Sequence, residues 1–207
     1  MNRKLGIVCM ILGIVLMLGA GVLYMYNCQE DISAQESAQD TLSVLAQQVQ
    51  ENTNNPSEKA PELQKPVELL TEEDKKMTEV TINSVSYIGY LSIPSLGLDL
   101  PVTADWSYQL LRKSPCRYHG SVRGEDLVLM AHNYSSHFGK ISQLALGDSV
   151  VFTDMDGAVT YYEVVGEDVL DPTSVEEFTS GDFDLTLFTC TYGGEYRVTV
   201  YCDKAAA

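Results

Sequence analysis

Cysteine 190 stands at the end of a β-prone segment in the C-terminal part of the chain. The segment 184–190 reads DLTLFTC, and a turn-forming stretch with two glycines follows it. A thiol at the end of a strand is held rigidly and lies open to substrate, which is the placement that a nucleophile needs. Free cysteines are also often buried core residues, so the position of Cys190 alone leaves both interpretations open.

Arg197 lies seven residues after Cys190, on the next predicted strand. The two-glycine turn can fold this strand back, so that the guanidinium lies beside the thiol. There its permanent charge and several N–H donors could stabilise a thiolate, and also an oxyanion formed during acyl transfer. An isolated arginine on a half-exposed strand can equally point into solvent.

His132 has a similar placement, because it follows the apolar segment 127–131, LVLMA. An imidazole at the end of a strand can accept a proton from a nucleophile and donate one to a leaving amine. His119 and His137 compete for this role, but the first lies in an apparent loop and the second lies in a serine-rich turn. The residue types together indicate cysteine-dependent acyl transfer.

The sequence indicates neither a metal nor a cofactor. None of the five cysteines forms a C-x-x-C pair, and no acidic loop of the EF-hand type is present. Cys116 and Cys202 could pair in an oxidising compartment, but we expect them to remain free, since nothing in the sequence brings them together.

The composition is strongly acidic, with 29 Asp and Glu residues against 13 Lys and Arg residues. So few cations cannot neutralise a phosphate backbone, so we expect no nucleic-acid partner. The length of 207 residues suits one modest globular domain with appendages.

Residues 5–26 form an uncharged apolar stretch, long enough at about 1.5 Å per residue to cross a hydrocarbon core of about 30 Å. Arg3 and Lys4 precede it and acidic residues follow, so the positive-inside rule places residues 1–4 in the cytoplasm. A cleaved signal peptide would have a shorter apolar region and a small-x-small site, and bulky residues before Cys28 disfavour a lipid anchor there. The sequence therefore predicts a single-pass protein of the cell membrane with its catalytic domain outside the cell.

Residues 27–80 are predicted to form an extracellular stalk and linker. Apolar residues recur at helix-compatible spacings between Ile32 and Val49, which suggests a weakly amphipathic helical stalk. Three prolines among polar residues in 51–76 indicate an extended linker that cannot bury a core. We therefore expect the folded domain to span residues 81–204.

Within 81–204 the signals are strands separated by turns, and Asp156-Gly157 marks a hairpin between two of them. The helical pieces are too short to serve as crossover helices. We therefore predict a mainly β fold, a closed or nearly closed barrel with short helices, because closure removes exposed sheet edges. The predicted strands are 87–93, 98–102, 127–131, 150–153, 159–165, 184–189 and 196–201, and the predicted short helices are 107–111, 138–144 and 174–178.

The segment 186–190, TLFTC, resembles the sortases of Gram-positive bacteria, because it matches their Thr-Leu-x-Thr-Cys motif in full. The upstream histidine, the arginine on the following strand and the N-terminal anchor also fit, and the likeness covers roughly residues 87–202. The resemblance implies a sortase-type barrel that cleaves a C-terminal sorting signal, LPxTG-like, after its threonine. The acyl group would then be joined to an amine of the cell wall or of another protein.

The resemblance also implies a role for each matching residue. Cys190 would be the nucleophile, His132 the general acid and base, and Arg197 the group that stabilises the oxyanion or positions the substrate. Thr189 would support the substrate or the oxyanion through its backbone or hydroxyl. The implied partners are surface proteins that bear a sorting signal, and an amine acceptor in cell-wall precursor or in another protein.

The subclass of sortase stays open in the sequence. The Ala-His-Asn sequence around His132 and the nearby Phe138 look more like class B, and a class D-like enzyme also fits. Two alternatives outside this family remain: a hydrolytic cysteine peptidase that uses water as its acceptor, and a non-catalytic extracellular domain that binds peptide.

Overall fold

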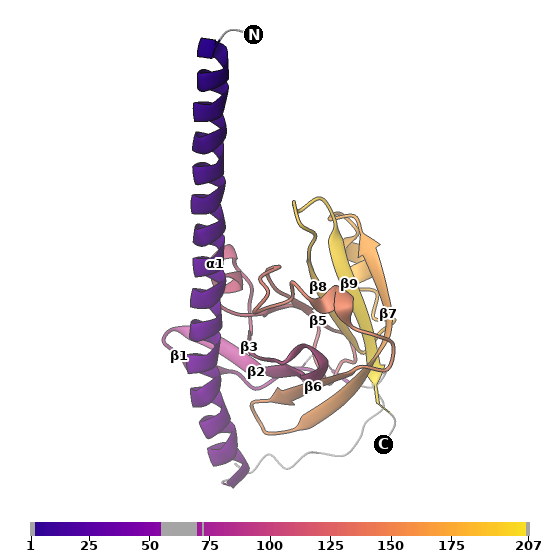
Figure 1. Ribbon diagram of the computed structural model, residues 1–207. Helices are drawn as coiled ribbons and strands as arrows, with labels where there is room; N and C mark the ends of the chain where they lie inside the picture. The colour runs from indigo at the N-terminus through magenta and orange to yellow at the C-terminus, as the bar shows by residue number, and fades with distance from the viewer. Residues whose placement is uncertain (1–2, 55–69, 72, 206–207) are drawn as a thin grey trace.

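One helix, α1 (Arg3–Asn54), forms most of the N-terminal quarter of the chain in the computed structural model (Figure 1). The structure describes residues 3–54, 70–71 and 73–205, so most of the predicted linker lies outside the described residues. The predicted apolar span and the predicted helical stalk belong to this single helix, without a break between them. Among the described residues α1 is the one helix long and apolar enough to cross a membrane.

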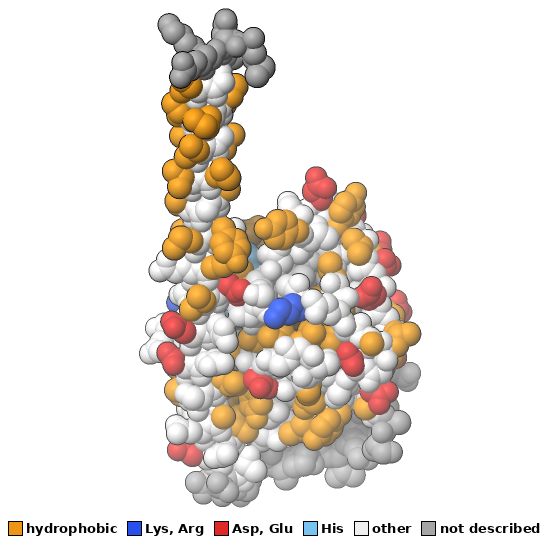
Figure 2. Space-filling model, viewed as in Figure 1, with side chains coloured by type: hydrophobic (Ala, Val, Ile, Leu, Met, Phe, Trp, Pro, Cys, Tyr) orange, Lys and Arg blue, Asp and Glu red, His pale blue; other side chains and the backbone are white. Residues whose placement is uncertain are grey.

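The two halves of α1 have different surroundings. The half that carries the apolar stretch stands clear of the barrel, and Figure 2 shows hydrophobic side chains over its visible surface. The half that follows packs on the barrel through a stripe of buried residues, Ala34, Ala38, Leu45 and Val49. These residues recur at helical spacing, so they share one face of α1. The predicted stalk is therefore a helix docked on the domain.

The strands form a nine-stranded sheet that closes into a barrel. Eight of them make the closed ring β2-β3-β4-β5-β8-β9-β7-β6, because β6 also pairs with β2, while β1 extends β2 outside the ring. Neighbours are antiparallel except for β3 with β4 and β5 with β8. The strands are β1 (Val80–Ile82), β2 (Val85–Ile93), β3 (Leu98–Thr103), β4 (Cys116–His119), β5 (Leu127–Met130), β6 (Ser149–Asp154), β7 (Val159–Leu170), β8 (Leu185–Cys190) and β9 (Arg197–Lys204).

The prediction of a mainly β, closed barrel is confirmed, and each of the seven predicted strands is present. The helical segments are short: η2 (Pro94–Leu96), α2 (Tyr108–Leu111), η3 (Ile141–Gln143) and α3 (Val175–Phe178). Two short strands, β1 and β4, were not predicted. The expectation that His119 lies in a loop was wrong, because this residue ends β4.

The barrel closes at β2, which pairs with β3 on one side and with β6 on the other. Gly89 lies at a bulge in β2 with φ +151°, and a Cβ there would come within 2.1 Å of the Thr153 carbonyl oxygen. Only glycine can occupy this position without moving the backbone. Alternating side chains fill the interior, as in β7, where Tyr162 and Val164 are buried and Tyr161 and Val165 are exposed.

Candidate active site

The antiparallel pairing of β8 with β9 places Cys190 directly opposite Arg197. The chain reverses between them in the turn 191–196, where Thr191 N–H donates to the Tyr196 carbonyl at 2.9 Å. Gly193 and Gly194 have φ +107° and +81° in this turn, a region that favours glycine. The turn that the sequence suggested therefore brings the two backbone positions side by side.

His132 reaches the same edge of the barrel through the parallel pairing of β5 with β8. This pairing sets Met130 beside Phe188, and Ala131 N–H continues it by donating to the Phe188 carbonyl at 3.3 Å. The next residues along the two strands lead to His132 and Cys190, which therefore leave neighbouring strands at the same end of the barrel.

Two side-chain hydrogen bonds fasten these strand ends to each other. The buried Thr189 hydroxyl donates to the Ala131 carbonyl at 2.8 Å. Asn133 Nδ2 donates to the Thr191 carbonyl at 3.5 Å. The residues beside His132 are therefore tied to the residues on either side of Cys190, which fixes the separation of the two strand ends.

The Cys190 thiol differs from the other two thiols of the barrel in its accessibility. Cys190 is partly exposed, whereas Cys116 and Cys202 are buried, and all three are free. Burial raises the pKa of Cys116 to about 11 and that of Cys202 to about 12. Since the thiolate is the reactive form, burial works against chemistry at Cys116 and Cys202, and Cys190 is the barrel thiol that is partly exposed.

The electrostatic surroundings of His132 favour the neutral imidazole. Burial lowers the pKa of the half-buried His132, Arg112 lowers it further, and Glu30 acts in the opposite direction. A neutral imidazole can accept a proton, as a base beside a thiol must. The ring also packs against Tyr134, with 5.0 Å between the ring centroids.

The two competing histidines do not share this position. His137 is fully buried, and burial lowers its pKa to about 4. His119 ends β4 opposite Val128, toward the start of β5, with its Nε2 3.8 Å from an Asp126 oxygen. Of the three histidines, His132 is the one that directly follows a strand at the edge that carries Cys190.

Arg197 is half-buried and its side chain folds over the turn. Its Nη1 donates to the carbonyls of Gly194 and Tyr196, both at 3.1 Å. These two bonds hold the guanidinium on the turn that follows Cys190. They are made to backbone acceptors, so the guanidinium can exchange them for a developing oxyanion.

Residues of α1 also belong to the surroundings of the site, which sequence reasoning missed. Asp31 accepts hydrogen bonds from the Ser136 N–H at 3.0 Å and from the hydroxyls of Ser135 and Ser136. Glu30 accepts a hydrogen bond from the Tyr134 hydroxyl at 3.3 Å. These contacts join positions more than 100 residues apart in sequence, and no local pattern signals them.

The described residues contain no group of three or more His, Cys, Asp or Glu side chains placed to hold a metal ion. The acidic residues of the barrel instead make surface contacts. An example is Asp156, which accepts a hydrogen bond from the Thr78 hydroxyl at 2.8 Å and lies 3.6 Å from Arg123.

Comparison with known proteins gives the family. The model of the sortase domain matches residues 91–205, more than half of the chain. No match was found among curated proteins. Similar solved structures bear the names of sortase classes C and D, so the class B-like or class D-like assignment stays a prediction.

Three of these structures illustrate the likeness. Sortase C1 from Streptococcus suis is 27% identical, with a TM-score of 0.51 over 58% of this chain and 74% of that one. Clostridium perfringens sortase C with the C-terminal cell wall sorting motif is 24% identical, with a TM-score of 0.53 over 81% of this chain and 91% of that one. A Clostridium perfringens sortase D5 transpeptidase is 18% identical, with a TM-score of 0.53 over 67% and 91%. With its matching domain and its barrel, the chain belongs to the sortase family of cysteine transpeptidases.

Proposed function

We propose that this sortase cleaves a C-terminal, LPxTG-like sorting signal after its threonine and transfers the acyl group to an amine. The observation that carries this proposal is the meeting of three strand ends, which brings His132, Cys190 and Arg197 to one edge of the barrel. One of the similar structures is a sortase C with a C-terminal cell wall sorting motif, which supports this class of substrate.

The first step forms a thioester. Cys190 Sγ attacks the threonyl carbonyl carbon while the thiol proton moves to the neutral imidazole of His132. The bond from this carbon to the following nitrogen then breaks, and His132 returns the proton to the leaving amine. Arg197 stabilises the oxyanion between these events, after its guanidinium leaves the carbonyls of the turn.

The second step resolves the thioester. An amine of cell-wall precursor or of another protein attacks the same carbonyl carbon, and His132 takes up its proton. The carbon–sulfur bond breaks and the proton passes to Cys190 Sγ, which restores the free enzyme. Water in place of the amine would give hydrolysis, so the acceptor decides between a transpeptidase and a peptidase.

In our proposal, Thr189 supports this chemistry by positioning the strand ends that carry His132 and Cys190. Its hydroxyl, which the sequence offered as a contact to substrate or oxyanion, is buried and donates to the Ala131 carbonyl. The bond holds the residue before His132 beside the residue before Cys190. Any support to substrate then comes from the backbone of Thr189 rather than from its hydroxyl.

The proposed location follows from α1. The apolar stretch crosses the cell membrane once, residues 1–4 lie in the cytoplasm, and the barrel lies outside. Surface proteins that bear a sorting signal would reach Cys190 on this side, together with the amine acceptor.

Product analysis tests the proposed transfer. The full chain in nanodiscs is incubated with an LPxTG-like peptide, with and without a small amine such as triglycine. We expect an amide-linked product that requires the amine and disappears with Cys190→Ala. Cys28→Ala, which removes a partly buried thiol of α1, is the matched control and should retain the product. A hydrolysed peptide that the amine never intercepts would contradict transfer and indicate a peptidase.

A further inference from the structure

We propose that the turn 191–196, between β8 and β9, rests on the surface of the bilayer that α1 crosses, so that the catalytic end of the barrel faces the membrane. This inference goes beyond the transpeptidase activity and needs only that α1 spans the bilayer. It follows from the way α1 is joined to the barrel, from the direction of the barrel along α1, and from the side chains of the turn.

The barrel begins almost at the point where the apolar stretch of α1 ends. Tyr26 is the last residue of that stretch, and α1 continues through it without a break. Glu30 lies one helical turn further, about 6 Å along the axis. It already contacts the barrel, through the Tyr134 hydroxyl at 3.3 Å and Arg112 at 3.9 Å. The loop after His132 is thereby held close to the expected membrane surface.

Asp31 strengthens this joint. It accepts hydrogen bonds from Ser135 and Ser136, including the backbone N–H of Ser136. Burial raises the pKa of Asp31, but these hydrogen bonds outweigh it and the pKa is lowered overall. The carboxylate is therefore charged at neutral pH, when charge-assisted hydrogen bonds are strongest. The loop cannot swing away from α1 without breaking these bonds.

The opposite end of the barrel is fixed to the far end of α1. Asn52 Nδ2 donates to the Met155 carbonyl at 3.0 Å, at the hairpin between β6 and β7. From Asp31 to Asn52 the helix rises about 32 Å. The barrel is thus aligned along α1 with its catalytic end toward the apolar stretch and this hairpin away from it. Figure 1 shows the same direction: the β8–β9 turn lies on the side of the free half of α1.

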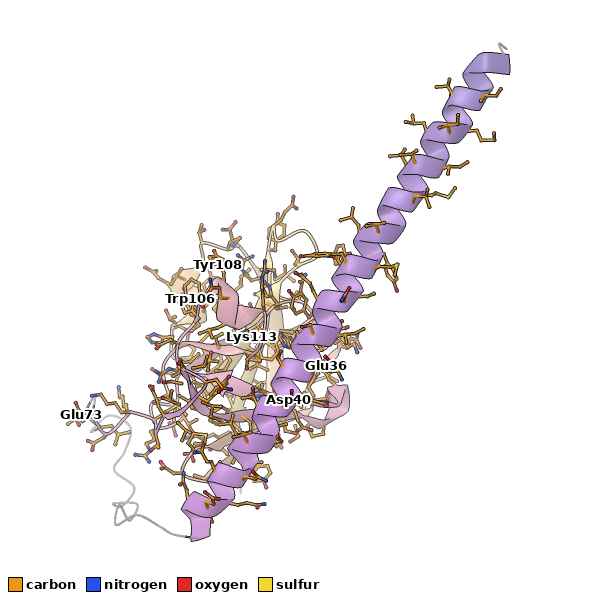
Figure 3. All side chains as sticks on the ribbon, turned by 90° about the vertical axis from the view of Figure 1, so that its left-hand side faces the viewer. Glu36, Asp40, Glu73, Trp106, Tyr108 and Lys113 are labelled. Atoms are coloured by element: carbon orange, nitrogen blue, oxygen red, sulfur yellow. The ribbon has the colours of Figure 1, made fainter. Side chains whose placement is uncertain are left out.

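The side chains at this end suit a membrane interface. Tyr192 is 98% exposed at the tip of the turn, and Tyr196 is also exposed. Figure 3 shows two more exposed aromatic residues, Trp106 and Tyr108, on the upper part of the barrel, on the side away from the free half of α1. Tyrosine and tryptophan are enriched at the headgroup level of bilayers. Glu195, also exposed in the turn, would keep it among the headgroups rather than in the hydrocarbon.

This arrangement has a functional consequence. The edge that carries Cys190 opens toward the bilayer, so the thiol meets substrates and acceptors that are themselves held at the membrane surface. An exposed aromatic turn could instead bind a peptide or a second copy of the chain. The joint to α1 favours the bilayer, because the apolar stretch and the turn lie at the same end of the barrel.

Bromolipid quenching tests the proposal, because Trp106 is the single tryptophan of the chain. Two full-length variants each carry one new probe: Trp106→Phe with Tyr192→Trp, and Trp106→Phe with Tyr161→Trp. Tyr161 is also exposed but lies near the start of β7, by the distant hairpin, and serves as the matched control. Each variant is placed in phosphatidylcholine nanodiscs with or without lipid brominated near the headgroup end of its acyl chains.

We expect bromolipid to remove much of the emission of the Tyr192→Trp probe and to leave the Tyr161→Trp probe unchanged. The native Trp106 gives a second reading in the unmodified chain, and bromolipid should quench a larger share of its emission than of the emission of the Tyr161→Trp probe. Equal, weak quenching of all three would overturn the proposal. So would an unquenched Tyr192→Trp probe whose emission responds only to added sorting peptide or to protein concentration. The readout needs no activity, so its failure would leave the acyl-transfer assay unaffected.

Discussion

Replacing Thr189 by valine isolates the contribution of one hydroxyl to the site. Valine has nearly the same shape as threonine, so Thr189→Val opens no cavity, and it removes only the donor to the Ala131 carbonyl at 2.8 Å. That carbonyl belongs to the residue before His132, and Thr189 is the residue before Cys190. The change therefore loosens the link between the two strand ends without touching either proposed catalytic side chain.

The loss in free energy of unfolding caused by Thr189→Val follows from the burial of this hydrogen bond. A net intramolecular hydrogen bond contributes about 0.5–1.5 kcal/mol, and an acceptor left without a partner adds a desolvation penalty, so the loss is about 1–3 kcal/mol. For a chain of this size each kcal/mol lowers Tm by about 2–4 °C. Because His132 then moves more freely relative to Cys190, the rate of thioester formation should fall at saturating peptide, with little change in apparent affinity.

Thermal unfolding and single-turnover acylation, followed by intact mass, measure the two effects. Thr189→Ser keeps the hydroxyl and should behave close to the unmodified chain in both measurements. If Thr189→Val keeps its Tm and the peptide no longer binds, the hydroxyl contacts substrate and the positioning argument is wrong.

Three further predictions concern α1, the acid–base group and the buried thiols. Leu45→Ala should lower the free energy of unfolding by about 2–5 kcal/mol, because Leu45 is fully buried between α1 and the barrel. Val44→Ala, on the exposed face of α1, should lower it little. If urea unfolding gives comparable losses for the two variants, α1 is not docked on the barrel. Arg112→Gln removes a cation that lowers the pKa of His132, so this pKa should rise and the acid limb of the pH–rate profile should move to higher pH. If the acid limb stays in place or moves to lower pH, the titration of His132 does not cause that limb. Cys116, with its pKa raised to about 11 by burial, should resist a thiol reagent until the barrel unfolds, which peptide mapping can check.

Much of the barrel could be predicted because its strands carry their own signals. The segment that ends at Cys190 is apolar and rich in β-forming residues. Asp156-Gly157 marks the hairpin between β6 and β7 by residue type alone. The strand β4 escaped because Cys116–His119 contains arginine and histidine and has no apolar alternation. Its pairing with β5 decides its conformation, and a local pattern cannot report a partner strand.

The placement of the candidate residues Cys190, Arg197 and His132 at strand ends was predictable from the sequence. That His132 and Cys190 leave neighbouring strands depends on the parallel pairing of β5 with β8, which joins segments nearly 60 residues apart. The bonds of Asp31 to the serine-rich turn depend on a separation of more than 100 residues. Both belong to the tertiary packing, and the charges of α1 alone suggested only its direction across the membrane.

The helix α1 shows how packing can extend an element beyond its sequence signal. The stretch after the apolar run has scattered apolar residues among Gln, Ser and Asp, which suggested a weakly amphipathic stalk. In the structure Ala34 and Ala38 are buried against the barrel, where small side chains allow close approach, and Leu45 and Val49 fill the space further along. Ala34 and Ala38 therefore belong to the face of α1 that docks on the barrel.

In the proposed mechanism, Cys190 carries the acyl group. The most direct measurement is the intact mass of the full chain in nanodiscs after incubation with LPxTG-like peptides, followed by peptide mapping of any adduct. We predict a mass increase equal to the peptide up to its threonine, located on Cys190, absent in Cys190→Ala and greatly reduced in His132→Ala and Arg197→Ala. An adduct that persists in Cys190→Ala, or a reactive Cys190 that never acquires the acyl group from any such peptide, would contradict the account.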